Sequence, residues 1–313
     1  MNYIDNDFYK LFKLIKSMDK NELFLNIKNH FNNIPNTTRE SIINFLNKFK
    51  FWGILNPSEG NFEEIENRTE ALFEHIDDFY WLYNKLEDFY SKEILLGIIS
   101  NWFYYDFEIL NKVIDKRFYP YFDLDIIPNC KDECIVDLGV YTGDTILDYI
   151  NTYGKDSYSH IYCYDITDES MVFAKNNLKN YDNISFRKKA VSDTNDTLFL
   201  NMYSDISSNR VSNSGDAKIE SVTLDNDITD KITMIKMDIE GSEYNALLGT
   251  KNHIINENPK LLISVYHGYK DLYRIPKLIY NLNKNYKFYL RYYGGSIFPT
   301  EITLIAICDD ELL

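Results

Sequence analysis

The sequence has few of the features that mark membrane proteins or zinc modules. Its 313 residues contain no run of about 18 apolar residues, and the N-terminal stretch MNYIDNDFYKLFKLIK is amphipathic with charges of both signs. We therefore expect neither a membrane span nor a signal peptide. The cysteines form no C-x-x-C pair, which argues against a zinc site, and most lie in apolar runs typical of core thiols. The simplest expectation is a cytoplasmic protein.

Basic residues are also scarce. Lysine and arginine number 33 against 48 aspartates and glutamates, which gives a net charge of −15. Such a balance argues against nucleic acid or an anionic membrane as a partner, because both attract basic surfaces. The composition is otherwise that of a globular protein, and the length suits about two domains.

The first part of the chain, residues 1–118, has the spacing of amphipathic helices. Apolar residues recur every three or four positions, first at Phe8, Leu11, Leu14, Ile15 and Met18, and later in one long helix at Leu72, Ile76, Phe79, Tyr83, Leu86 and Tyr90. We find no chemical motif in this part. It is predicted to be a separate helical bundle that serves substrate capture or the formation of a homodimer.

The second part, residues 119–313, alternates between strand and helix patterns. The stretches ECIVDLG, HIYCYD, ISFRKKAV, ITMIKMD and KLLISVYH read as buried strands, and YKFYLRYY and EITLIAIC follow with only a short loop between them. Alternation of this kind predicts an α/β fold with a parallel sheet. Five parallel strands followed by an antiparallel C-terminal hairpin form the Rossmann-like sheet of class I methyltransferases, not of dehydrogenases.

The first predicted strand runs into the turn DLGVYTGDT, where Asp137, Gly139 and Gly143 form D-x-G-x-x-x-G. This spacing differs from the G-x-G-x-x-G of dinucleotide-binding proteins. Gly139 would let a ligand approach the backbone and Gly143 would open the next helix. We expect this turn, with Tyr141 and Thr145, to bind a nucleoside that carries an amino acid.

The next two predicted strands also end in polar residues. Asp165, followed by Ile166, ends the second strand, where a carboxylate can accept hydrogen bonds from both ribose hydroxyls. Asp168 is expected to cap the following helix and to leave Asp165 free. Ser192 and Asp193 follow the third strand and are placed to meet an adenine edge.

The stretch MIKMDIEGSEYNALLG places three carboxylates, Asp238, Glu240 and Glu243, at the end of the fourth strand. Glu243 suits the first turn of a helix, where it complements the dipole, but it is also a candidate for substrate binding. Asp238 and Glu240 are expected to face the ammonium and sulfonium groups of S-adenosylmethionine, or a substrate hydroxyl.

Two further candidates concern the acceptor. His267, preceded by Tyr266, ends the fifth predicted strand at the same edge of the sheet, where it could act as a general base. Arg210 lies in the polar segment YSDISSNRVSNSGDAK, a candidate lid, and could meet an acidic or phosphate-bearing acceptor.

The residues from about 121 to 307 resemble the FkbM-type family of S-adenosylmethionine-dependent methyltransferases. The resemblance is carried by VDLGVYTGDT, SVTLDN, IKMDIEGSEYNALLGT, ISVYHGYKDLYRIPKLI, YKFYLRYY and EITLIAI. It implies cofactor roles for Asp137, Gly139, Gly143, Asp165 and Asp238, and O-methylation of hydroxyls on sugars, surface polysaccharides or flagellar glycans. The chain departs from the family at Asp165-Ile166, where Glu-Pro is usual.

Several alternatives stay open from the sequence. His267, or Glu240 in second place, would remove the acceptor proton, while a divalent metal held by Asp238, Glu240 and His267 could polarise the hydroxyl instead; no metal is predicted. An N-methyltransferase acting on an amino-sugar or peptide amine would share every cofactor residue. A catalytically silent module that binds a biosynthetic partner is the alternative of another class.

Overall fold

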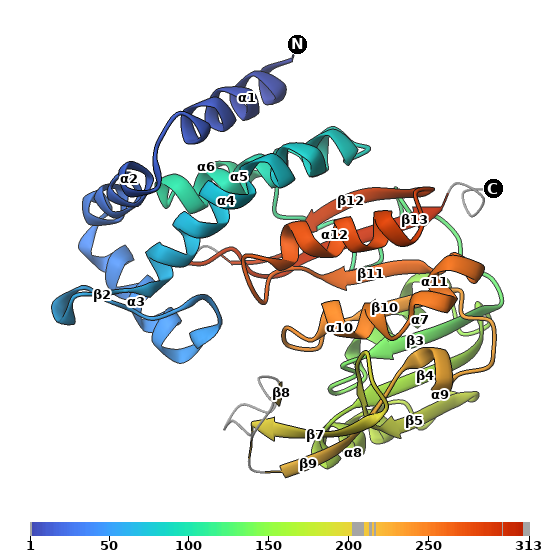
Figure 1. The fold of residues 1–313 in the computed structure, drawn as a ribbon. Coiled ribbons are helices and arrows are strands. Elements are labelled where there is room, and N and C mark those ends of the chain that lie inside the picture. The colour runs from blue at the N-terminus through green and yellow to red at the C-terminus, as the bar shows by residue number, and fades with distance from the viewer. Residues whose placement is uncertain (1, 202–209, 213–214, 216, 296, 309–313) are drawn as a thin grey trace. The chain divides into compact units, whose positions relative to one another are not determined.

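The structure is a computed structural model that describes residues 2–201, 210–212, 215, 217–295 and 297–308 (Figure 1). It has the mixed α/β fold that the sequence predicted. Contacts between Cα atoms divide the chain into two compact units. The first comprises Met1–Asp115, Val265–Pro276 and Phe288–Thr303, and the second comprises Lys116–Ser264, Lys277–Lys287 and Leu304–Leu313.

The first unit is built mainly from helices. They are α1 (Tyr3–Lys16), α2 (Lys20–Asn33), α3 (Asn36–Lys48), α4 (Glu63–Lys85), α5 (Phe89–Tyr104) and α6 (Glu108–Lys112). Helices α1 and α2 pack against α4 and α5. The buried residues of α1 are Ile4, Phe8, Leu11 and Ile15. The spacing predicted the last three, whereas Leu14, which was expected on the same face, is exposed. Between α3 and α4 lie the short elements η1 (Lys50–Trp52), β1 (Leu55–Asn56), η2 (Pro57–Glu59) and β2 (Asn61–Phe62).

The long helix predicted from Leu72 to Tyr90 is two helices. Helix α4 ends at Lys85, and Leu86 has an extended backbone. Asp88 then caps α5, because its side chain accepts a hydrogen bond from the amide of Ser91 at 2.7 Å. Leu86 is buried although it lies between the two helices, so the apolar spacing continues across the break. The spacing alone therefore could not reveal that α4 ends and that Asp88 caps a second helix.

The main sheet has the strand order β12-β13-β11-β10-β3-β4-β5. Its strands are β3 (Glu133–Leu138), β4 (Tyr158–Asp165), β5 (Ile184–Lys188), β10 (Met234–Met237), β11 (Lys260–Ser264), β12 (Tyr286–Tyr292) and β13 (Ile302–Cys308). The pairs from β11 to β5 are parallel. The loop between β12 and β13 is closed by a bond from the amide of Tyr293 to the carbonyl of Glu301, at 3.0 Å. The seven strands are those that the sequence predicted for the main sheet.

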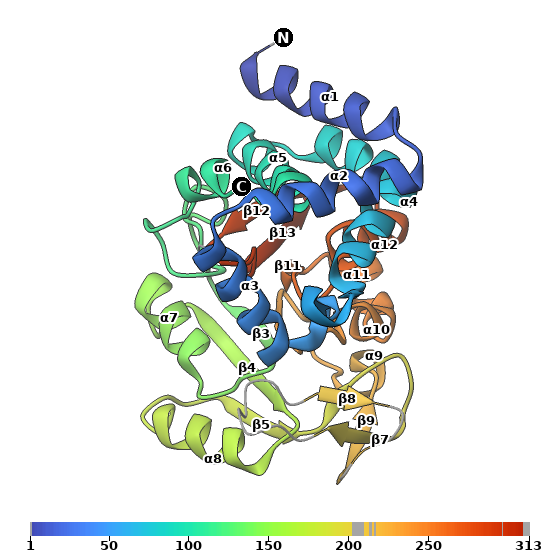
Figure 2. The ribbon, with the colours of Figure 1, turned by 90° about the vertical axis from the view of Figure 1, so that its left-hand side faces the viewer.

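Helices cover both faces of the parallel strands, which explains why β3, β10 and β11 are buried along their whole length. The helices that follow the strands are α7 (Asp144–Tyr153), α8 (Asp168–Asn177), α9 (Leu224–Asp227), α10 (Glu243–Leu248), α11 (Lys251–Glu257) and α12 (Asp271–Leu282). Helices α7 and α8 lie on one face of the sheet, and α10 and α11 lie on the other (Figure 2). Within the described part of the chain, no helix combines the length and the apolar character that a bilayer crossing requires.

A second, smaller sheet was not predicted. Its strands are β6 (Ala190–Val191), β7 (Asp196–Asn201), β8 (Arg210–Ser212) and β9 (Ala217–Val222), in the order β6-β9-β7-β8. The stretch ISFRKKAV therefore splits into β5 and β6, because Ala190 and Val191 pair with β9 instead of continuing the main sheet. Most of the candidate lid, residues 203–218, lies outside the described residues.

Candidate active site

A cleft lies at the carboxyl ends of β3, β4 and β10, where ligands bind in open α/β sheets. It encloses about 910 Å³, including space open to solvent. It is lined by Leu138, Gly139, Tyr141, Asp144, Thr145, Tyr164, Asp165, Ile166, Ser170, Lys189, Ala190, Val191, Lys236, Asp238, Ile239, Glu240 and Ser242. Seven of these residues belong to the predicted site: Gly139, Tyr141, Thr145, Asp165, Ile166, Asp238 and Glu240.

The turn after β3 depends on two glycines with left-handed backbones, since Gly139 and Gly143 both have a φ of +82°. A Cβ atom on Gly139 would lie 1.9 Å from the carbonyl oxygen of Asp238. The missing side chain therefore lets the β3 turn pack against the loop after β10. Gly143 precedes α7, as predicted, and its amide donates to the carbonyl of Val140 at 2.7 Å.

Asp137 lies beneath this turn and does not line the cleft. Its fully buried carboxylate has Oδ1 at 3.0 Å from Nζ of Lys236, the residue opposite it on β10. The pKa values of the two partners show how burial and the ion pair compete. Burial raises the pKa of Asp137 to about 6 against the attraction of Lys236. Burial lowers the pKa of Lys236, but the nearby carboxylates, Asp137 first among them, raise it, and the net shift is upward.

Asp165 lines the cleft, but its carboxylate is already used. One oxygen accepts from the amide of Tyr141 at 3.0 Å, and the other accepts from the amides of Ile166 and Thr167 at 2.8 and 3.1 Å. Burial raises the pKa of Asp165, and these amides oppose the rise. The expected cap was wrong: Thr167 caps α8 and Asp168 pairs with Lys188 at the surface. A ribose would share Asp165 with the two loops that it joins.

The segment after β5 contacts the cleft earlier than expected. Lys189, Ala190 and Val191 line the cleft, whereas Ser192 and Asp193 are absent from its lining. The Ser192 hydroxyl donates to Asp193 at 3.1 Å. Their role at an adenine edge stays a prediction. Sequence reasoning missed the three lining residues because the chain leaves the main sheet at Lys189, and the apolar periodicity does not reveal this change.

The loop after β10 holds its carboxylates in different ways. The hydroxyl of Tyr121 donates to Oδ2 of Asp238 at 2.9 Å and lies 2.9 Å from the Ser264 hydroxyl. Glu240 has a left-handed backbone, with a φ of +57°. Glu243 is fully buried, and its Oε1 accepts from the amide of Ile239 at 2.9 Å. Glu243 thus folds back on the loop, and its substrate role stays a prediction.

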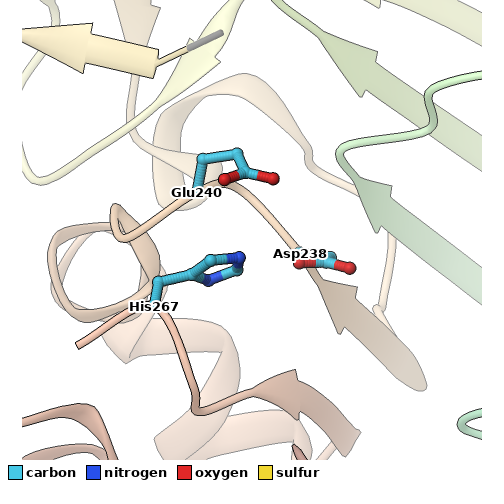
Figure 3. A group of neighbouring side chains, drawn as sticks. All are labelled: Asp238, Glu240 and His267. Carbon is cyan, nitrogen blue, oxygen red and sulfur yellow. The ribbon is translucent and has the colours of Figure 1, made fainter. Parts of the chain in front are cut away.

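Strand register brings the third predicted catalytic residue to this edge. Because Met237 pairs with Ile263 in the parallel β10–β11 ladder, Asp238 follows one strand where Ser264 ends the other, and His267 is three residues further. One potential ligand atom from each of Asp238, Glu240 and His267 lies within 4.8 Å of the other two (Figure 3). Two carboxylates and an imidazole suit either proton transfer or a divalent cation.

The loop that carries His267 is held by the helical part of its own unit. Nε1 of Trp52 donates to the carbonyl of Tyr266 at 3.0 Å. The hydroxyl of Tyr269 donates to Glu64 on α4 at 2.6 Å. His267 is buried, with its ring 4.3 Å from that of Tyr266 and 6.1 Å from that of Phe51. No sequence motif pointed to Trp52 or Glu64, since their partners are 200 residues or more away along the chain.

Arg210, the predicted acceptor contact, is the first residue of β8. Its backbone pairs with Asn201 on β7, and its side chain lies outside the described part of the structure. Its role toward the acceptor stays a prediction.

The residues around this cleft are similar to those of a known family of domains. Residues 137–290 match the methyltransferase FkbM domain. This match includes the glycine turn, Asp165, the loop after β10 and His267. No curated protein sequence matches the chain.

Solved structures with the same fold include the methyltransferase FkbM from Methylobacillus flagellatus KT. It is 23% identical, with a TM-score of 0.64 over 79% of this chain and 63% of that chain. The chain thus spans less than two thirds of that protein. A more distant match is the fibrillarin from Aeropyrum pernix, solved with natively bound S-adenosyl-L-methionine. It is 9% identical, with a TM-score of 0.37 over 57% of this chain and 67% of that chain. Another is the precorrin-6y C5,15-methyltransferase from Geobacter metallireducens GS-15, which is 10% identical, with a TM-score of 0.37 over 64% of this chain and 95% of that chain.

Proposed function

We propose that the protein transfers the methyl group of S-adenosylmethionine to a hydroxyl group on a sugar or glycan, since residues 137–290 match the methyltransferase FkbM domain. The observation that carries the proposal is the cleft at the strand ends, which is lined by Asp144, Asp165, Asp238 and Glu240. A cluster of carboxylates suits a ligand with an ammonium and a sulfonium group.

The residues of the cleft suggest an orientation for the cofactor. Asp165 would accept hydrogen bonds from the ribose, and Lys189, Ala190 and Val191 would contact the adenine. The amino-acid end would then extend across Gly139 toward Asp238, since the strand order runs from β4 through β3 to β10. The sulfonium supplies an activated methyl group, so the protein mainly has to hold the acceptor oxygen in line with it.

An unactivated hydroxyl must also lose its proton. A base in hydrogen-bond reach contributes about 10²–10⁴-fold to the rate of such a step. His267 is the proposed base, because a neutral imidazole accepts a proton at physiological pH and its ring lies beside Asp238 and Glu240 (Figure 3). Glu240 is the second candidate. A divalent ion held by Asp238, Glu240 and His267 would instead polarise the hydroxyl, and an ion requirement decides between the two.

The helical part, predicted to end near residue 118, is proposed to shape the acceptor side of the site. Trp52 and Glu64 both bond to the loop that carries His267, which favours a role in acceptor capture over a role confined to dimer formation. Light scattering of the full chain, with and without acceptor, tests this assignment. A dimer whose dissociation leaves turnover unchanged would support self-association instead.

Transfer of label from S-adenosylmethionine to a panel of acceptors tests the function. The panel contains glycan fragments with free hydroxyls, matched amino-sugars and peptides with free amines, and the methylated atom is identified by NMR. We expect a methyl ether on a glycan. A methylated amine would select the N-methyltransferase instead. If the protein binds no cofactor in a calorimeter, the silent partner-binding module is the better interpretation.

A further inference from the structure

Strand β10 contains a lysine where the fold calls for an apolar residue. Lys236 is 4% exposed, and its neighbours Met234, Ile235 and Met237 are buried as well. Central parallel strands are covered on both faces and are usually apolar throughout. A cation in this position destabilises the fold unless its charge and hydrogen bonds are satisfied.

The partners of Lys236 hold its ammonium group at the wall of the cleft. Nζ lies 3.0 Å from Oδ1 of Asp137 and donates to the carbonyl oxygen of Gly139 at 2.8 Å. An ammonium group has three N–H donors; the bond to Gly139 uses one of them, and the contact with Asp137 is an ion pair. Lys236 also lines the cleft, next to Gly139 and Asp238. The side chain is therefore fixed before any ligand arrives, with donor capacity left at the cleft.

The position of Lys236 matches one end of the proposed cofactor. A ribose at Asp165 places the amino-acid part at the ends of β3 and β10, and that part carries both an ammonium and a carboxylate. The basic residues of the cleft lining are Lys189 and Lys236. Lys189 follows β5 at the opposite end and pairs with Asp227 and Glu220, at 3.0 Å each. Lys236 is thus the cation of the lining at the amino-acid end.

We infer that Lys236 binds the α-carboxylate of the cofactor's methionine part, while Asp238 faces the ammonium group. The inference rests on the proposed function, since it takes S-adenosylmethionine as the ligand. Asp137 and Gly139 orient Nζ in advance, so little side-chain freedom is lost on binding. A bond between an ammonium and a carboxylate is of the stronger, charge-assisted kind.

Two ligands that differ only in the carboxylate test the inference: S-adenosylmethionine and its decarboxylated form. Calorimetry of the wild-type protein should show a preference of about 10- to 100-fold for the complete cofactor, the range of a charge-assisted hydrogen bond. In Lys236→Met the preference should fall to about twofold or less, because only the complete cofactor loses a partner. Lys236→Arg should retain most of the preference, and Lys189→Met should leave it unchanged.

The alternatives give different results. If Lys236→Met weakens both ligands by the same factor, the lysine acts only by holding the Gly139 turn, and the inference is wrong. Equal affinities of the wild-type protein for the two ligands would overturn it as well, even if Lys236→Met does not fold. If the wild-type protein binds neither ligand, the proposed function fails before the role of Lys236 is tested. Thermal melting of each variant establishes that it is folded.

Discussion

Two buried ion pairs, Glu64–Arg68 on α4 and Asp137–Lys236 in the main sheet, differ in how completely their surroundings satisfy them. Glu64 accepts from Arg68, from Tyr269 at 2.6 Å and from Tyr105 at 2.7 Å. Arg68 in turn donates to the carbonyl of Asn101 at 2.8 Å and packs over the Tyr105 ring.

The sheet pair is less complete. Neither carboxylate oxygen of Asp137 makes a hydrogen bond to any residue that the structure describes, although the side chain is fully buried. Its cation, Lys236, lines the cleft, whereas Glu64 and Arg68 do not. A network with every group satisfied makes the structure specific and rigid. A pair left incomplete beside a cleft is the kind of strained arrangement that functional sites retain at the expense of stability.

The largest effect is expected from the helical pair. Glu64→Gln leaves the buried Arg68 without a counter-charge, and we expect the free energy of unfolding to fall by about 3–5 kcal/mol. Urea unfolding measures this change. Glu66→Gln, an exposed position on the same helix, is the matched control and should have little effect. Wild-type stability in Glu64→Gln would remove the contrast between the two pairs.

The contribution of the sheet pair to the free energy of unfolding should depend on pH. The pKa of Asp137 is raised from 3.8 to about 6, so the folded state holds a proton that the unfolded chain has already released between these values. Stability from this group is present below about pH 4 and is lost as the pH rises through about 6, by on the order of 3 kcal/mol.

Asp137→Asn removes this titration. The difference in unfolding free energy between wild type and variant should therefore shrink or reverse between about pH 4 and about pH 7, and subtraction cancels the other carboxylates. Because Asp137→Asn also leaves the buried Lys236 without its counter-charge, we expect the variant to lose some stability near neutral pH, but less than Glu64→Gln does. A variant that loses several kcal/mol there would make this pair as structural as the helical one.

The next prediction concerns the affinity of the cleft for the cofactor. Asp165→Ala removes the proposed ribose acceptor, and the affinity for S-adenosylhomocysteine should fall by about 1.5–3 kcal/mol. Asp168→Ala, an exposed acid three residues away, is the control and should bind as wild type does. Calorimetry on both variants provides the measurement. Equal affinities would show that Asp165 only joins the loops of Tyr141 and Thr167.

The last substitution concerns the loop held by the helical part. His267→Ala should lower kcat by at least about tenfold, with cofactor affinity unchanged within about twofold, as expected for an interaction made in the transition state. Labelled-methyl transfer under saturating cofactor measures it. If turnover persists in the variant, Glu240 becomes the proposed base.

Metal ions sharpen this last prediction. Addition of Mg²⁺ or Mn²⁺, and removal with a chelator, should leave wild-type turnover unchanged if His267 takes the proton directly. Loss of activity with the chelator would make His267 a ligand together with Asp238 and Glu240.

Much of this arrangement could be predicted from local sequence, and the remainder depends on distant contacts. The seven strands of the main sheet could be predicted from short apolar runs. The glycine turn and the DIEGSE loop could be predicted from the polar residues that directly follow such runs. Lys236, inside the apolar run MIKM, looked like an ordinary strand position until Asp137 was found opposite it. The short sheet around β7 escaped notice because its strands are short and lack long apolar runs.

The contact between Gly139 and the Asp238 carbonyl limits how this cleft can be redesigned. Any side chain at position 139 would have to displace the backbone that carries Asp238, 1.9 Å from the added atom, so a substitution there alters two walls at once. Selection for a bulkier cofactor analogue would therefore succeed more readily at Lys189, Ala190 and Val191. Lys189 precedes β6, and Ala190 and Val191 form it, so a substitution there leaves the backbone of the acidic wall in place.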